Sequence, residues 1–351
     1  MKKLAVHHLE IGMEVVKLDR KWLETPFVKH NFVIESKKQL AQLSKFCNYV
    51  YINNSYNLAL TNKNIKSPCD NQEQCKTALS TSYKLLNNAL NDFQENSYIC
   101  AQKIKKIVNF LTIQVLSNSA TYEYLNTIQS NSPNLAHKSL RVLVIYLTFC
   151  KYLGIKKSKL LNLGCAAVLH DIGMLKIPVA FDKAVKFTAT ERVHITKHST
   201  LGETLVRENQ DFSPVVAQVI KSHHEYYNGS GYPAGLSGRD INLYSRMLTL
   251  VCTYEAITRN RGYKNALNSY SAITELARVS GSMLDPRLVG RFIEMVGEYP
   301  VGTRIRTQNN EIVQVLAKIE KDTYQVTPTS AEGYDRINLL ETSSFAGVIY
   351  E

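Results

Sequence analysis

Two short clusters of histidine and acidic residues are the part of this sequence best suited to chemistry. His170 and Asp171 stand side by side at the end of the apolar stretch LGCAAVLHDIGMLKIP. Further along, the stretch IKSHHEYYNGSGYPAGL carries His223, His224 and Glu225. Burying an aspartate among histidines is costly unless a cation neutralises and coordinates them, and neutral imidazoles can fill a coordination sphere without adding charge. Each residue alone could be a polar side chain at a helix end, but their gathering indicates a metal site.

Helix-start signals predict that helices carry these histidines into the site. Ser158 is placed to cap a helix that ends at His170. Ser213-Pro214 opens the helix that delivers the second histidine pair, with proline at its first turn. Thr188 begins a capping-box pattern before a further helix, which carries His198.

Hydrophobic periodicity divides the chain into five stretches. Residues 1–60 combine alternating strand patterns with one short helix, which predicts a small α+β domain. Residues 61–76 are polar and predict a linker, and residues 77–130 predict a helical connector. Residues 131–300 form the main helical domain, and residues 301–351 read as a β-rich appendage. The predicted fold class is therefore mainly α.

The histidine motifs resemble those of the HD-GYP phosphodiesterases, a branch of the HD metal-dependent phosphohydrolases. The similarity rests on HDIGMLKIP at 170–178, HHE at 223–225 and GYP at 231–233, and it continues through KHSTLG at 197–202. It covers about residues 130–300 in order. The resemblance implies an HD-type helical bundle and hydrolysis of cyclic di-GMP to pGpG or GMP. The segment LDRKWLETPF similarly resembles the N-terminal domain that often precedes HD-GYP modules in proteobacteria.

The resemblance also implies how metal would be bound. In the family two metals share the HD aspartate, here Asp171. One site is implied for Asp171, His198, His223 and His224, which are all present. Three nitrogens and one carboxylate suit zinc, iron or manganese. The neighbouring site retains His170 and Asp171, the implied catalytic pair, but lacks other ligands. We therefore expect one divalent transition metal per chain.

Four family positions carry different residues here. The upstream histidine falls on Lys138, the family's aspartate on Cys252, the preceding acidic residue on Asn134, and the lysine after the HD motif on Met174. A Lys138 ammonium aimed at Asp171 would place a fixed positive charge where a metal ion would bind, and the alternative is that Lys138 extends to solvent. Cys252 could bind a soft metal as thiolate or be a small buried core residue. These changes predict weakened activity.

The resemblance assigns further residues to ligands and partners. Arg261 and Lys264, in TRNRGYKNA, match positions that contact the ligand phosphates. Arginine can grip a phosphate with two donors and lysine adds a point charge. The alternative is a pair of exposed basic residues. The loop of Gly231, Tyr232 and Pro233 is implied to contact GGDEF-type or other signalling proteins.

Bulk properties limit the classes of protein. The net charge of +12 suits an anionic ligand such as cyclic di-GMP, but the lysines are dispersed, which disfavours nucleic-acid binding. The longest apolar run, residues 142–150, is too short to span a bilayer, and the start MKKLAVHHLE lacks a signal-peptide core. Seven cysteines without a paired pattern suit a reducing compartment. We expect a cytoplasmic protein.

Three functions remain as alternatives. The first is a cyclic di-GMP phosphodiesterase homologue with weakened activity. The second is a catalytically inactive HD-GYP module that acts as a cyclic di-GMP sensor or a protein-interaction domain. The third, a generic HD nucleotidase, leaves the GYP loop unexplained. We favour the first, because the metal ligands and phosphate-binding cations are retained.

Overall fold

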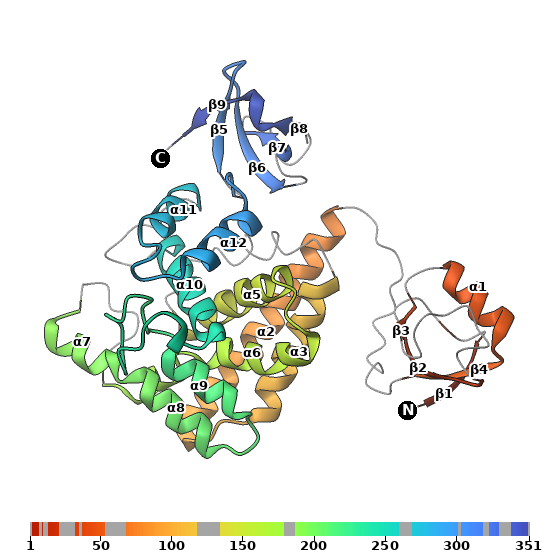
Figure 1. Ribbon diagram of the computed structural model, residues 1–351, viewed down its shortest axis with the longest axis horizontal. Coiled ribbons are helices and arrows are strands. Elements are labelled where there is room, and N and C mark those ends of the chain that lie inside the picture. Colours follow the sequence, from red (N-terminus) through yellow and green to blue (C-terminus); the bar gives the residue numbers. More distant parts are fainter. Residues whose placement is uncertain are drawn as a thin grey trace. The chain divides into compact units, whose positions relative to one another are not determined.

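The structure is a computed structural model of the chain (Figure 1). It describes residues 2–6, 9, 13–20, 32–34, 37–52, 68–117, 134–178, 187–259, 269–300, 303–318, 323–329 and 338–349. By its internal contacts the chain divides into two units, Met1–Ile65 and Lys66–Glu351.

The first unit is a small α+β domain. Its antiparallel sheet has the strand order β1-β4-β2-β3. The strands are β1 (Lys2–Ala5), β2 (Glu14–Leu18), β3 (Phe32–Val33) and β4 (Tyr49–Ile52), with helix α1 (Lys37–Phe46) between the last two. Apolar side chains of the strands and of α1 form its own small core. The α+β prediction for this region is confirmed.

The second unit is dominated by helices around one core. The helices are α2 (Pro68–Asn96), α3 (Ala101–Ser117), α5 (Leu135–Tyr152), α6 (Lys157–Leu169), α7 (Ala189–Thr196), α8 (His198–Glu208), α9 (Pro214–Ser222), α10 (Leu243–Thr258), α11 (Ser269–Arg278) and α12 (Pro286–Val296). A short 3₁₀ helix, η4 (Ile172–Lys176), follows α6. Helix α5 is apolar on nearly all its faces and is buried among α2, α3, α6, α10 and α12. The predicted helical bundle is confirmed.

The domain boundaries expected near α2 need a correction. Helix α2 begins at Pro68, inside the segment 61–76 that the sequence predicts as a linker. Residues 68–76 read PCDNQEQCK and carry almost no apolar side chains, so periodicity gives no helix signal there. Helices α2 and α3, expected within a separate connector at 77–130, contribute buried side chains to the same core as the later helices. They are part of the main helical unit.

Helix α2 also reaches the start of α5. The ring of Tyr83 stacks on that of His137, with centroids 3.9 Å apart and planes 23° from parallel. One turn along α2, the Oδ1 of Asn87 accepts a hydrogen bond of 3.2 Å from Asn134. Since Lys138 follows His137 directly, α2 packs beside the helix turn that carries Lys138.

The predicted helix starts near the site are partly confirmed. Thr188 and Glu191 form a complete capping box, but the helix that it begins, α7, ends at Thr196, and His198 lies in the next helix, α8. Ser213 is the N-cap of α9, with proline in the first turn. Ser158 is not the cap, because α6 begins at Lys157 and its N-cap residue is Lys156. Ser158 therefore lies within the first turn of α6.

A five-stranded antiparallel sheet follows α12. Its order is β8-β7-β6-β5-β9. The strands are β5 (Arg304–Thr307), β6 (Ile312–Lys318), β7 (Thr323–Pro328), β8 (Asn338–Glu341) and β9 (Phe345–Val348). The predicted β-rich appendage is confirmed. Among the described residues, no helix is long and apolar enough to cross a membrane.

The absence of a side chain at Gly173 lets two elements of the site pack closely. A Cβ added at Gly173 in η4 would lie 2.1 Å from the carbonyl oxygen of His198, so η4 and the start of α8 can pack this closely only with glycine. We expect Gly173→Ala to lower the free energy of unfolding by about 1–3 kcal/mol, as overpacking does. Urea unfolding measures it.

The matched control is Gly290→Ala in α12. A Cβ there meets nothing within 4 Å, and alanine favours a helix interior by up to about 1 kcal/mol over glycine. Equal unfolding midpoints for the two variants would contradict the close contact at Gly173.

Candidate metal centre

Four side chains from separate elements converge on one point. Asp171 follows α6, His198 begins α8, and His223 and His224 follow the last turn of α9. One ligand atom from each of the four lies within 4.8 Å of all the others. The Oδ1 of Asp171 is 3.3 Å from the Nε2 of His198 and 3.8 Å from that of His223. These are the four residues that the sequence resemblance assigns to one metal.

Backbone carbonyls fix the orientation of two imidazoles. The Nδ1 of His198 lies 2.6 Å from the carbonyl oxygen of Ile195, and the Nδ1 of His223 lies 2.6 Å from that of Ile220. A carbonyl oxygen only accepts hydrogen bonds, so each Nδ1 must carry the proton. Each Nε2 is then unprotonated in the neutral ring and points at Asp171. Metal-binding histidines are commonly oriented in this way.

The two Nε2 atoms face each other at 3.3 Å. Two lone pairs at this separation repel unless a cation lies between them. Two nitrogens bound at about 2.1 Å to one tetrahedral metal would be separated by about 3.4 Å. Burial lowers the pKa of His223 to about 4, which keeps its ring neutral and able to coordinate. The donor set therefore fits a divalent transition metal.

The carboxylate of Asp171 is ionised despite its burial. Burial alone would raise its pKa, but the charges of His170 and Lys138 hold the pKa well below its usual value. Its second oxygen, Oδ2, forms an ion pair with the ammonium of Lys138. The side chains of Lys138 and Asp171 are only 13% and 4% exposed. The Oδ1 of Asp171 thus faces the imidazoles of His198 and His223, and its Oδ2 faces the ammonium of Lys138.

The Gly-Tyr-Pro loop covers the metal-binding residues. The ring of Tyr232 stacks on that of His224, with centroids 4.7 Å apart and planes 18° from parallel. Glu225 accepts hydrogen bonds from the backbone N–H of Ala234, at 2.7 Å, and of Leu236, at 3.0 Å. The Glu225 carboxylate thus holds the loop closed.

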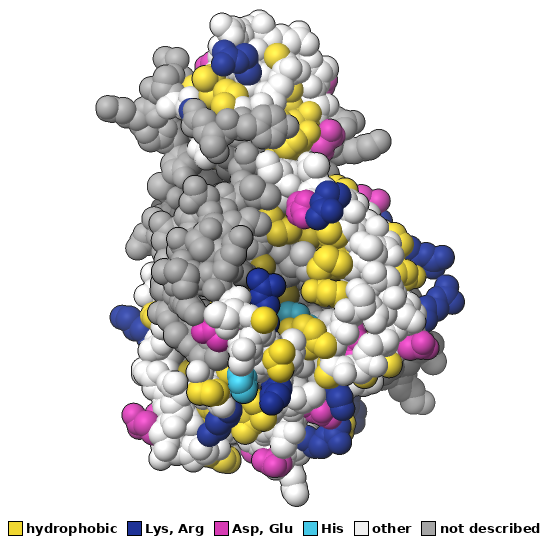
Figure 2. Space-filling model, turned by 90° about the vertical axis from the view of Figure 1, so that its left-hand side faces the viewer, with side chains coloured by type: hydrophobic (Ala, Val, Ile, Leu, Met, Phe, Trp, Pro, Cys, Tyr) yellow, Lys and Arg dark blue, Asp and Glu magenta, His cyan; other side chains and the backbone are white. Residues whose placement is uncertain are grey.

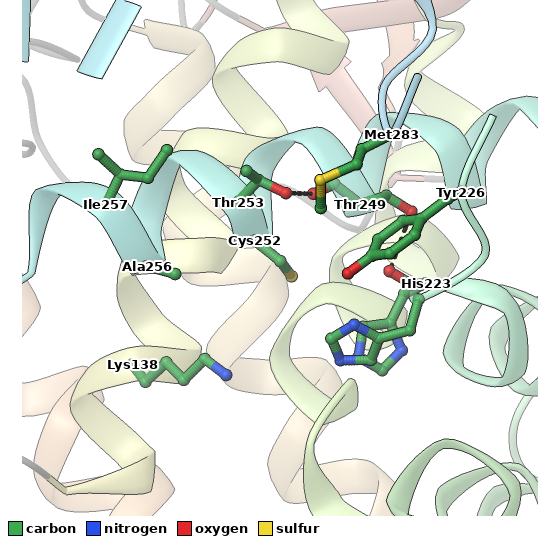
Figure 3. A pocket seen from close by; sticks show the side chains of 10 residues that line it. Lys138, His223, Tyr226, Thr249, Cys252, Thr253, Ala256, Ile257 and Met283 are labelled. Atoms are coloured by element: carbon green, nitrogen blue, oxygen red, sulfur yellow. Dashed lines mark hydrogen bonds between the residues drawn. The ribbon is translucent and has the colours of Figure 1, made fainter. Parts of the chain in front are cut away.

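A pocket of about 300 Å³ adjoins the histidines (Figure 3). It is lined by Lys138, His223, His224, Tyr226, Thr249, Cys252, Thr253, Ala256, Ile257 and Met283. The space-filling view shows hydrophobic side chains interspersed with basic and histidine side chains on one face of the molecule (Figure 2). The pocket therefore combines imidazoles, one ammonium and an apolar wall from α10, as a small-molecule site does.

Two family models match the chain. One, described as HD domain, matches residues 124–288, and the other, a domain of unknown function (DUF3391), matches residues 1–103. The cyclic di-GMP phosphodiesterase PA4108 of Pseudomonas aeruginosa is 26% identical over 338 residues, which cover 90% of this chain and 81% of that protein.

Two further proteins are similar. The 3'3'-cGAMP-specific phosphodiesterase 2 of Vibrio cholerae is 28% identical over 52% of this chain and 35% of its own length. The solved structure of Bd1817, an HDG"Y"P protein from Bdellovibrio bacteriovorus, has a TM-score of 0.54 and 16% identity, and the match covers 83% of this chain and 97% of that one. This chain contains an HD domain. It is a homologue of cyclic di-GMP phosphodiesterases in the HD superfamily of metal-dependent hydrolases.

The four positions that depart from the HD-GYP pattern have definite places. Of the two alternatives for Lys138, the structure shows the inward one, on Asp171. Cys252 is buried on α10 and lines the pocket, outside the four-residue metal group. Met174 is buried in η4. Asn134 is the N-cap of α5 and accepts from the N–H of Ala136 at 2.7 Å.

His170 lies beside the metal group and not within it. Its Nδ1 bonds to the carbonyl oxygen of Ala167 at 2.8 Å, and its buried Nε2 lies 3.3 Å from the Oδ2 of Asp171. Burial alone would lower the pKa of His170, but the charge of Asp171 raises it to about 10. Its predicted roles in catalysis and metal binding stay predictions. Arg261 and Lys264 lie outside the described residues.

Sequence reasoning missed part of the pocket. Tyr226 directly follows the His-His-Glu motif and could have been found from that position. Thr249, Thr253 and Ile257 recur at four-residue spacing on α10, which is equally typical of an ordinary helix face. Met283 comes from a distant loop, so no local pattern indicates it.

The Lys138–Asp171 ion pair gives a stability prediction. Removing one partner of a buried pair leaves an uncompensated charge and costs about 3–5 kcal/mol. We expect a loss of this size in the free energy of unfolding for Lys138→Met, measured by urea unfolding of the metal-free protein. The control is Lys103→Met, whose solvent-exposed pair with Asp92 should contribute little to stability. Similar losses in both variants would show that the Lys138 pair contributes no more to the free energy of unfolding than an exposed ion pair does.

Proposed function

We propose that this protein binds cyclic di-GMP in the described pocket and hydrolyses it to pGpG or GMP with weakened activity. One divalent transition metal, which is zinc, iron or manganese, would be held by Asp171, His198, His223 and His224. The observation that carries this proposal is the convergence of four ligand atoms at the edge of a pocket. The named activities of the relatives support the substrate class.

Each residue has a defined task in this proposal. When bound, the metal supplies a Lewis acid and lowers the pKa of a coordinated water. Asp171 and the three imidazoles hold it, and the backbone carbonyls behind the rings keep the Nε2 lone pairs directed inward. Lys138 adds a positive charge to the pocket wall, which attracts a phosphodiester. An ammonium cannot activate a second water as a metal does, so we propose that hydrolysis is slow.

A second candidate function rests on the same ion pair. Because Lys138 neutralises the Oδ2 of Asp171, the site has a built-in cation in place of a second metal. An inactive cyclic di-GMP sensor or interaction module could use this cation and would not need a second metal. We also propose that residues 231–233 contact GGDEF-type or other signalling proteins. Arg261 and Lys264 would contact the ligand phosphates, and the protein would act in the cytoplasm.

Metal content tests the site directly. We expect about one equivalent of transition metal per chain in anaerobically purified protein, because only one complete donor set is assembled among the described residues. His223→Ala should lose most of it, measured by elemental analysis. His194→Ala, a histidine in the last turn of α7, is the control and should keep its metal. Two equivalents in the native protein would contradict the proposed single site.

Restoring the family's ligands tests the cause of weak activity. Lys138→His combined with Cys252→Asp should bind a second metal and raise turnover of cyclic di-GMP at least about tenfold, since a second metal stabilises transition-state charge. Each single change should recover less, and adding Met174→Lys should raise turnover further. Chromatographic measurement of pGpG and GMP follows the reaction. The idea fails if the native protein is already as fast as the double variant.

A further inference from the structure

Two loops form one wall of the pocket and hold each other in place. The backbone N–H of Tyr227 donates to the carbonyl of Met283 at 3.0 Å, and that of Asn228 donates to the carbonyl of Ser282 at 2.9 Å. Within the first loop, the N–H of Gly229 donates to the carbonyl of Tyr226 at 2.8 Å. The backbone on both sides of this wall is therefore fixed, and so is the place from which the Tyr226 side chain starts.

The side chain of Tyr226 extends from this wall into the pocket. Figure 3 shows its hydroxyl directed toward the space bounded by Cys252, Lys138 and the histidines. Lys138 approaches the same space from α5, on the other side of the pocket. A ligand in the pocket would thus meet an ammonium on one side and a phenol on the other.

The other hydroxyls that line the pocket are committed to backbone carbonyls. The hydroxyl of Thr249 lies 2.9 Å from the carbonyl oxygens of both His223 and Ser245, to which it can donate. The hydroxyl of Thr253 donates to the carbonyl of Thr249 at 2.8 Å. Among the described lining residues, the Tyr226 phenol is therefore the neutral hydroxyl that remains to donate to a ligand.

We propose that Tyr226 is a substrate-binding residue whose hydroxyl donates a hydrogen bond to a non-bridging oxygen of the phosphodiester. This inference rests on the proposed function, which supplies the phosphodiester. An O–H donor to an anionic oxygen makes a short, strong hydrogen bond. A neutral donor also adds binding without placing a further positive charge beside Lys138 and a metal.

Tyr226→Phe tests the proposal, because it removes the hydroxyl and keeps the ring. The probes are cyclic di-GMP and inorganic phosphate, each titrated by calorimetry into the full chain loaded with manganese. We expect the Kd to rise about ten- to a hundredfold for both probes, the loss typical of a hydrogen bond to a charged group. Tyr227→Phe is the matched control, since it removes a hydroxyl from the next residue, which does not line the pocket, and its Kd values should not change.

The outcomes separate this inference from the proposed function. Unchanged affinity of Tyr226→Phe for both probes overturns the inference, and so does a loss confined to cyclic di-GMP, which would mean that the hydroxyl contacts base or sugar. If the native protein binds phosphate through Tyr226 but not cyclic di-GMP, the inference stands and the proposed substrate is wrong. If it binds neither probe, both are wrong. Tyr226→Leu, which keeps an apolar side chain, should reproduce the loss if Tyr226→Phe folds poorly.

Discussion

A buried carboxylate is the constraint on which this site depends. Asp171 cannot remain ionised in a helical core without cations or donors at both oxygens, because the desolvation cost would otherwise shift it to the neutral form. The fold supplies an ammonium at Oδ2, and at Oδ1 it gathers imidazole nitrogens that would share a metal cation with the carboxylate. Helices α5, α6, α8 and α9 each bring a group to this one residue. The packing of these helices therefore determines whether the carboxylate can stay ionised.

Helix ends solve a second problem at the same time. The last carbonyls of a helix have no partner within the helix and need a donor from elsewhere. His170 and His223 lie just past the ends of α6 and α9, and each gives its Nδ1 proton to a carbonyl three residues back. In both residues this hydrogen bond satisfies the end of the helix. In His223 it also leaves Nε2 able to bind a cation, whereas the Nε2 of His170 faces the Oδ2 of Asp171.

Short sequence patterns predict many of the helices and strands of this structure, whereas features that depend on contacts between distant residues could not be predicted. The α1 and β4 segments and the capping box at Thr188 follow from short patterns that neighbours in sequence complete among themselves. The start of α2 could not be predicted, because PCDNQEQCK has no apolar period, and neither could the direction of Lys138, which depends on a carboxylate from another helix. The Tyr226 wall is set by backbone hydrogen bonds to a loop far along the chain, which no spacing in the sequence encodes.

The shared core of α2 and α3 bears on how this protein can evolve. Both helices precede the HD-domain match at 124–288, and the DUF3391 match ends within α3, yet Leu86, Phe93, Ile104 and Leu111 are fully buried with the HD helices. A recombination event that exchanged the HD segment at its apparent edge would leave an apolar face uncovered. The part of the chain that folds as one core is consequently larger than the HD-domain match and includes α2 and α3.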